Sequence, residues 1–386
     1  RGSASASERR QADGGAGTDT LYVETQGQNE RVLVEGQLTS FEHFQADGDG
    51  AIEFRSGTYA FQQMQINDNG QLTVGAGATL SGGAAGVVFG QGDNRFTLAA
   101  GGKANGRIDG GDGNDTLAFS QGDGQTQKVS DIDAVNFEYL AASGEGELHI
   151  DADVTFTGGV LLEGGNIKVL EGVTLTADVI GGSSDDTFDN AGTVDGDIML
   201  GLGDDTYVAR TGSGVTAGHT INGGAGGDDT VVFNLNDGVG SLLGDYVDFE
   251  SIGVYGPGTL ELDLTEDYNS ITLWEEANLD LTSNGGTVGL IKGDNSAQTV
   301  TIDGALTGGV SLGGGNDTLN LGLGGVLSGD LDGGAGDNDV LNLQLTAESR
   351  VNGMKNFEVA NIASSGRALT LGGLGAGQRL NFRGAT

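Results

Sequence analysis

The sequence predicts an all-β fold, a single right-handed parallel β-helix in which the chain winds through stacked coils. Three observations indicate it: a long repeat marked by glycine-rich strings, a shorter interval inside that repeat, and short alternating apolar runs with almost no helical periodicity. A repeating chain without linkers favours one stacked body over several compact domains. We therefore expect residues 14–386 to form one elongated solenoid, preceded by a linker at residues 1–13.

The long repeat consists of the string GGxGxDTL followed by a Phe-Glu pair. Full copies begin at Gly14 and Gly110, and their Phe-Glu pairs follow at the same distance in both, at Phe41 and Phe137. Looser copies begin at Gly223 and Gly333, with their pairs at Phe249 and Phe357. The spacing of the four pairs defines imperfect repeats of about 110 residues.

A shorter interval divides each long repeat into coils. Partial motifs at Phe89, Leu200 and Leu312 precede the glycine strings at Gly110, Gly223 and Gly333. An interval of about 20 to 23 residues separates each partial motif from its glycine string, and three short strands with three turns need that many residues. We therefore expect each interval to form one three-sided coil. Alternating runs such as 260–264 place leucine inward and polar residues outward. The many glycines suit corners where φ is positive.

The glycine strings match the nonapeptide GGxGxDxUx, the calcium-binding repeat of RTX proteins. Calcium prefers six to eight oxygen ligands, which aspartates and turned carbonyls supply. If one interval is one coil, Asp205 lies below the Gly223 loop and Asp317 below the Gly333 loop, and stacked carboxylates of this kind repel unless neutralised. The strings are alternatively plain Gly-Asp corner turns. The candidate calcium ligands are Asp19, Asp115, Asp205, Asp229, Asp317 and Asp339.

The Phe-Glu pairs recur at one place in every repeat and are flanked by apolar residues. This pattern predicts packing: each phenylalanine is expected in the core and each glutamate outside. We expect no ligand at these pairs.

The charge balance excludes several partners. The chain has 55 acidic and 17 basic residues, a net charge of -38, and Lys292 is the only Lys or Arg between Thr211 and Ser349. Binding to nucleic acid needs clustered basic residues, so we expect no nucleic-acid partner. No apolar run is long enough to span a bilayer, so we expect no membrane insertion by this segment.

Catalytic patterns are missing from the sequence. His43, His149 and His219 occupy unrelated places in the repeats, and no HExxH, GxSxG or P-loop string occurs. We expect no enzymatic activity. Two alternatives stay open: a carbohydrate-active β-helix enzyme using acidic residues on the flank, and an RTX-type calcium-binding module.

The combination of GGxGxDTL, a strand, a Phe-Glu pair such as Phe41 and Glu42, and a short strand such as 366–371 resembles the passenger region of autotransporter (type V secreted) surface proteins. The resemblance covers residues 14–386. It implies a right-handed parallel β-helix, exported and held at the bacterial outer membrane by a C-terminal barrel beyond this segment. It also implies adhesion or self-association, as in biofilms, with a surface receptor, a glycan or another copy of the chain as partner.

Overall fold

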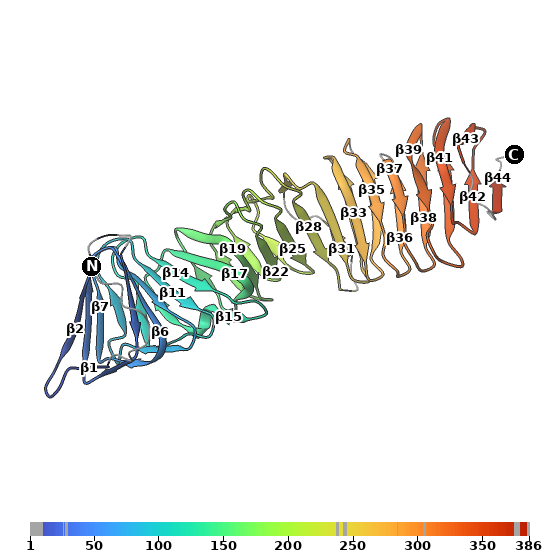
Figure 1. Cartoon of the computed structure of the whole chain (residues 1–386). Coiled ribbons are helices and arrows are strands. Elements are labelled where there is room, and N and C mark those ends of the chain that lie inside the picture. Colours follow the sequence, from blue (N-terminus) through green and yellow to red (C-terminus); the bar gives the residue numbers. More distant parts are fainter. Residues whose placement is uncertain are drawn as a thin grey trace. The chain divides into compact units, whose positions relative to one another are not determined.

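In the computed structural model the chain is built almost entirely of parallel β-strands (Figure 1). The structure describes residues 11–25, 27, 30–236, 239–241, 245–283, 285–303, 306–373 and 379–383. The one helical element within these ranges is a single 3-10 turn, η1 (Val129–Asp131). The predicted all-β solenoid of parallel strands is confirmed.

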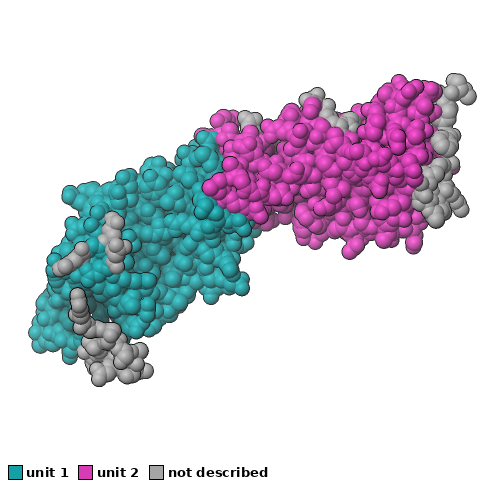
Figure 2. Space-filling model, turned by 45° about the horizontal axis from the view of Figure 1, so that its top comes forward, with its two compact units in different colours: residues 1–188, 192–200 teal, residues 189–191, 201–386 magenta. Residues whose placement is uncertain are grey.

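The chain divides into two compact units, coloured teal and magenta in Figure 2. Unit 1 comprises residues 1–188 and 192–200, and unit 2 comprises residues 189–191 and 201–386. Within each unit, successive coils place equivalent strands side by side in rows, and neighbouring strands in a row are hydrogen-bonded in parallel.

Unit 1 has two long rows. The first contains β2 (Thr20–Glu24), β5 (His43–Asp47), β7 (Gln63–Ile66), β10 (Val87–Phe89), β13 (Arg107–Asp109) and β16 (Asp133–Val135). The second contains β3 (Arg31–Glu35), β6 (Ala51–Ala60), β8 (Gln71–Val74), β11 (Arg95–Ala99), β14 (Thr116–Ser120), β17 (Tyr139–Ile150), β19 (Gly159–Val169), β21 (Val179–Ile180) and β24 (Ile198–Met199).

Shorter strands complete the coils in this half of the chain. They are β1 (Gln11–Asp13), β4 (Gln37–Thr39), β9 (Ala78–Ser81), β12 (Lys103–Asn105), β15 (Thr126–Lys128), β18 (Val154–Thr155), β20 (Thr174–Thr176), β22 (Thr187–Asn190) and β23 (Thr193–Asp195). Because β1 pairs with β4, the first coil begins at Gln11, inside the segment that the sequence predicted to be a linker. Residues 1–10 of that segment lie outside the described residues.

Unit 2 also has two long rows. One contains β25 (Thr206–Arg210), β28 (Thr230–Asn234), β31 (Ser251–Tyr255), β33 (Tyr268–Trp274), β35 (Val288–Lys292), β37 (Leu306–Ser311), β39 (Val326–Asp332), β41 (Ser349–Lys355) and β43 (Leu369–Leu371). The other contains β29 (Val239–Ser241), β32 (Thr259–Leu264), β34 (Asn278–Ser283), β36 (Thr299–Asp303), β38 (Thr318–Leu323), β40 (Val340–Leu345), β42 (Val359–Ala363) and β44 (Arg379–Arg383). The shorter strands are β26 (Gly214–Val215), β27 (Thr220–Asn222) and β30 (Asp245–Val247).

The register shows how long a coil is. Ser251 pairs with Ser270 in one coil and Thr206 with Thr230 in another, so the coil lengths vary on both sides of the predicted interval. Inward positions stack apolar side chains on one another. The stack of Val300, Leu319, Leu341 and Ala360 is completely buried and shows how a thin core continues from coil to coil.

Candidate functional site

The glycine string and the Phe-Glu pair, two separate motifs in the sequence, form one corner of the coil. In each long repeat the Phe-Glu pair lies one coil beyond the string. The residue before each phenylalanine adopts a left-handed backbone, as in Asn136 with φ 55°. A Cβ on Gly110 would lie 2.0 Å from the carbonyl oxygen of Asn136, so only glycine fits there. The other corners repeat this contact at Gly14 with Ser40, Gly223 with Asp248, and Gly333 with Asn356.

The aspartate of the string and the glutamate of the pair bond to each other through the backbone. The N–H of Asp115 donates to Glu138 Oε2 at 2.8 Å, and the carbonyl oxygen of Asp115 accepts the N–H groups of Glu138 and Tyr139. The same N–H to carboxylate bond recurs from Asp19 to Glu42 at 2.9 Å, from Asp229 to Glu250 at 2.8 Å, and from Asp339 to Glu358 at 2.6 Å. The glutamate of each pair therefore caps a corner by accepting the backbone N–H of the aspartate, a role that the packing prediction for these pairs did not include.

Carboxylates also link the coils that precede the cap. The N–H of Gln298 donates to Asp317 Oδ1 at 2.7 Å, and the N–H of Asp317 donates to Asp339 Oδ1 at 2.8 Å. With the bond from Asp339 to Glu358, four successive coils are joined at one corner. We call this series the 298–358 carboxylate ladder; it consists of Gln298, Asp317, Asp339 and Glu358. Shorter ladders run through Asn94, Asp115 and Glu138, and through Asp205, Asp229 and Glu250.

The stacking that the sequence predicted is present in the structure. Asp205 lies against Asp229 and Asp317 against Asp339, one coil apart in each case. In the strings at Gly223 and Gly333, the aspartate that leads into the strand, Asp229 or Asp339, stands one residue later than Asp115 does in its string. These later aspartates take the buried corner position.

The phenylalanines of the pairs were expected in the core. Phe137, Phe249 and Phe357 are buried as expected. Phe41 is only half-buried, so the packing expectation is incomplete at the first pair.

The aspartates of the ladders are deeply buried, whereas the glutamates that end them are half-buried. Asp115, Asp317 and Asp339 have no exposed surface, and their Oδ2 atoms are buried without a hydrogen-bond partner. Burial, with the neighbouring carboxylates of Asp339 and Asp294, raises the pKa of Asp317 to about 7. Burial likewise raises the pKa values of Asp115, Asp229 and Asp339. Loss of hydration therefore favours the protonated acid at these corners.

Successive corners move one side further around the coil. In unit 1, β2 and β13 lie in the same row. Asp19 comes before this row, because β2 follows it, whereas the Gly110 string comes after the row, because β13 precedes it. In unit 2, β28, β37 and β39 lie in the same row. Asp229 comes before this row, because β28 follows it, whereas Asp317 and Asp339 come after the row, because β37 and β39 precede them. The carboxylates therefore form short ladders on different edges, which differs from the uninterrupted tandem strings of an RTX roll.

Calcium binding at these aspartates stays a prediction. The structure brings the candidates Asp205 and Asp229, and Asp317 and Asp339, together in pairs, while Asp19 and Asp115 each stand with a glutamate. The buried Oδ2 atoms would suit a cation or a proton. Among the residues that the structure describes, no group of three or more His, Cys, Asp or Glu side chains could hold a metal ion, so two carboxylates would need many further oxygens.

Comparison of the chain with protein-family models, with curated proteins and with solved structures gives no significant match. No helix in the described part of the chain is long and apolar enough to cross a membrane.

Proposed function

We propose that the chain is an exported passenger or stalk segment of the bacterial cell surface that mediates adhesion or self-association. The proposal builds on the resemblance of its repeats to autotransporter passengers. The observation that carries it is the corner: the recurring acidic motif holds successive coils together through carboxylate to N–H bonds. A repeated scaffold held together in this way suits a protein whose work is to present a regular surface.

The outer surface supports the same proposal. Outward positions on the eight-stranded row of unit 2 carry acidic, amide and hydroxyl side chains in register, for example Asp280, Thr301 and Asn320. Such rows of polar groups repeat along the coil stack and can engage a repeating partner at many points. Multivalent contact raises avidity without any single tight site.

The test is surface display of the whole segment on bacteria through a heterologous outer-membrane anchor. We expect displaying cells to settle, or to attach to an abiotic or cellular surface, faster than cells carrying the anchor alone. Equal settling and attachment of the two strains would contradict the proposal. Turnover of an acidic polysaccharide by the purified segment, abolished by one Asp or Glu substitution, would replace it with the carbohydrate-active enzyme.

A further inference from the structure

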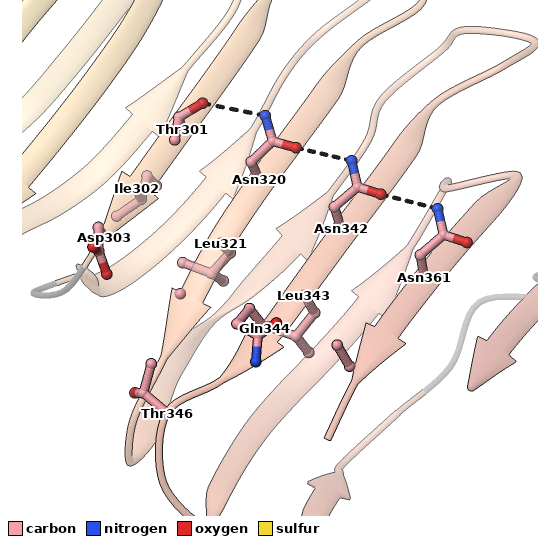
Figure 3. Close-up of a pocket in the computed structure, with 12 residues that line it drawn as sticks. Thr301, Ile302, Asp303, Asn320, Leu321, Asn342, Leu343, Gln344, Thr346 and Asn361 are labelled. Atoms are coloured by element: carbon pink, nitrogen blue, oxygen red, sulfur yellow. Dashed lines mark hydrogen bonds between the residues drawn. The ribbon is translucent and has the colours of Figure 1, made fainter. Parts of the chain in front are cut away.

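A groove crosses the outer face of unit 2 on strands β36, β38, β40 and β42 (Figure 3). Its volume is about 450 Å³, within the range of ligand sites. One side is formed by Thr301, Asn320, Asn342 and Asn361, which are in register on consecutive strands. The opposite side includes Asp303, Gln344 and Thr346. The groove therefore runs across the strands, along the direction in which the coils stack.

Hydrogen bonds fix the asparagines in one continuous row, which we call the amide ladder. Asn320 Nδ2 donates to Thr301 Oγ1 at 3.2 Å, Asn342 Nδ2 to Asn320 Oδ1 at 2.8 Å, and Asn361 Nδ2 to Asn342 Oδ1 at 2.9 Å, as the dashed lines in Figure 3 show. Asn381 continues the row with a bond of 3.3 Å to Asn361. The three central asparagines are half-buried and are held in place before any ligand arrives, which lowers the entropy cost of binding.

The amide ladder keeps hydrogen-bonding capacity for a ligand. A carboxamide has two N–H donors and an oxygen with two lone pairs, and one donor and one lone pair serve the ladder itself. A donor and an acceptor from each of Asn320, Asn342 and Asn361 are left over. They recur at the spacing of neighbouring strands, about 4.8 Å. Hydroxyl groups, which both donate and accept, are the natural partners of such a row.

The charge along this face points to an uncharged ligand. The same register positions carry carboxylates on earlier strands, Glu261 on β32 and Asp280 on β34, and change to amides from β38 onward. The residues that line the groove include one carboxylate, Asp303, and no Lys or Arg, and the basic residue in register with the lining is Arg383 on β44, beside Ala363. An anionic polymer therefore meets Asp303 but no cation within the lining itself. The outward lining offers amides, hydroxyls, the Asp303 carboxylate, Gly322 and Ala363, and no aromatic or large aliphatic side chain that would anchor an apolar peptide.

We propose that the amide-ladder groove binds a linear, uncharged glycan lying along the row from Thr301 to Asn361. This inference rests on the proposed adhesive function and names the ligand class of one face. Sugar hydroxyls of successive residues meet successive asparagines, so affinity grows with the length of the oligosaccharide.

The experiment measures binding of the whole segment to neutral hexasaccharides, namely cellohexaose, xylohexaose and laminarihexaose, by calorimetry and by ligand-observed NMR. Hexagalacturonate serves as the anionic comparison. We expect at least one neutral hexasaccharide to bind, its disaccharide to bind at least about tenfold more weakly, and hexagalacturonate to give no signal. Absence of binding by all three neutral probes at millimolar concentration would overturn the proposal.

Two variants locate the site. Asn342→Ala interrupts the amide ladder, and Ala363→Phe fills the groove while leaving the ladder hydrogen bonds intact, so the second variant guards against a simple folding defect. Each should weaken binding by about tenfold or more. The matched control is Asn352→Ala, an exposed asparagine on β41 bonded to the Ser328 carbonyl oxygen. Unchanged affinity in both groove variants would contradict the assignment.

Two outcomes separate this inference from the proposed function. If displayed cells adhere but Ala363→Phe adheres equally and no neutral glycan binds, the groove assignment fails while the adhesive function stands. If the purified segment self-associates and Ala363→Phe abolishes the association, the occupant is a second copy of the chain and the glycan proposal is overturned.

Discussion

The backbone N–H of Asp317 donates to the carboxylate Oδ1 of Asp339, one coil further along, at 2.8 Å. This bond defines the recurring corner: a buried carboxylate in one coil satisfies a backbone donor of the previous coil, and the glutamate of a Phe-Glu pair closes the series at Glu358. A buried N–H without an acceptor is costly, so the corner motif stabilises the contact between coils.

The 298–358 carboxylate ladder should make the protein more stable at mildly acidic pH. The pKa of Asp317 is raised to about 7 in the folded chain, against about 3.9 in an unfolded one. The folded state therefore binds the proton more tightly, and stability should rise as pH falls from about 7 towards about 4. Asp317→Asn should flatten this dependence by on the order of 2 kcal/mol between these limits.

Denaturant unfolding at several pH values measures this slope. The control is Asp303→Asn, which removes an exposed carboxylate on β36 and should keep the wild-type slope. A slope that is the same in wild type and Asp317→Asn would show that Asp317 titrates normally.

Glu138 caps the corner of Asp115. Replacing it with Ala leaves the Asp115 N–H without its acceptor and should cost about 1 to 3 kcal/mol, whereas Glu138→Gln retains an acceptor oxygen and should cost less. Thermal unfolding of both variants provides the comparison. Equal losses in the two would indicate that the side-chain bond contributes nothing.

Gly110 admits no side chain, since a Cβ would meet the Asn136 carbonyl oxygen at 2.0 Å. Gly110→Ala should destabilise the protein by about 2 to 4 kcal/mol, because a backbone group must move. Gly122→Ala is the matched control: its Cβ would make only ordinary contacts, and its effect should stay within about 0.5 kcal/mol. Similar losses for both substitutions would refute the steric role.

The phenylalanines of the pairs should differ in their contribution. Phe357 is 1% exposed, and Phe357→Ala should cost about 3 to 5 kcal/mol, with increased hydrogen exchange confined to neighbouring coils. Phe41→Ala should lower the free energy of unfolding by clearly less, because Phe41 is only half-buried. An equally large loss at Phe41 would contradict the burial argument.

Calcium should be tested against matched sodium. If a divalent ion binds the folded corners, millimolar Ca²⁺ raises the melting temperature by mass action beyond the general relief of repulsion among 55 acidic residues. Asp115→Ala should then remove part of the calcium increment. Identical melting curves in calcium, chelator and matched sodium would remove the metal prediction and leave the fold untouched.

Much of this fold could be predicted because strand alternation and coil length leave direct periods in the sequence. The stacking of Asp317 on Asp339 followed from the same interval. The sequence did not predict that the glycine string and the Phe-Glu pair form one corner, although Asp115 and Glu138 are separated in the sequence by the length of one coil. Residue spacing gives no direction for a backbone N–H, so the capping bond needed coordinates.

The amide ladder also left a signal. Asn320, Asn342 and Asn361 recur once per coil, but asparagine is common in turns and outward positions alike. The movement of the corner by one side per repeat is harder to foresee. The side on which a corner lies depends on the summed loop lengths of several coils. The sequence of a single corner does not show it, because the corner motifs resemble one another wherever they lie.

The most direct test of the carboxylate corner is amide hydrogen exchange at Asp317 in wild type and in Asp339→Ala. The substitution removes the acceptor of the Asp317 N–H, while the Gln298 N–H keeps its acceptor, Asp317 Oδ1, and serves as the internal reference. The carboxylate corner predicts faster exchange at Asp317 relative to Gln298 in the variant. Unchanged protection of Asp317, or equal acceleration at both amides, would contradict it.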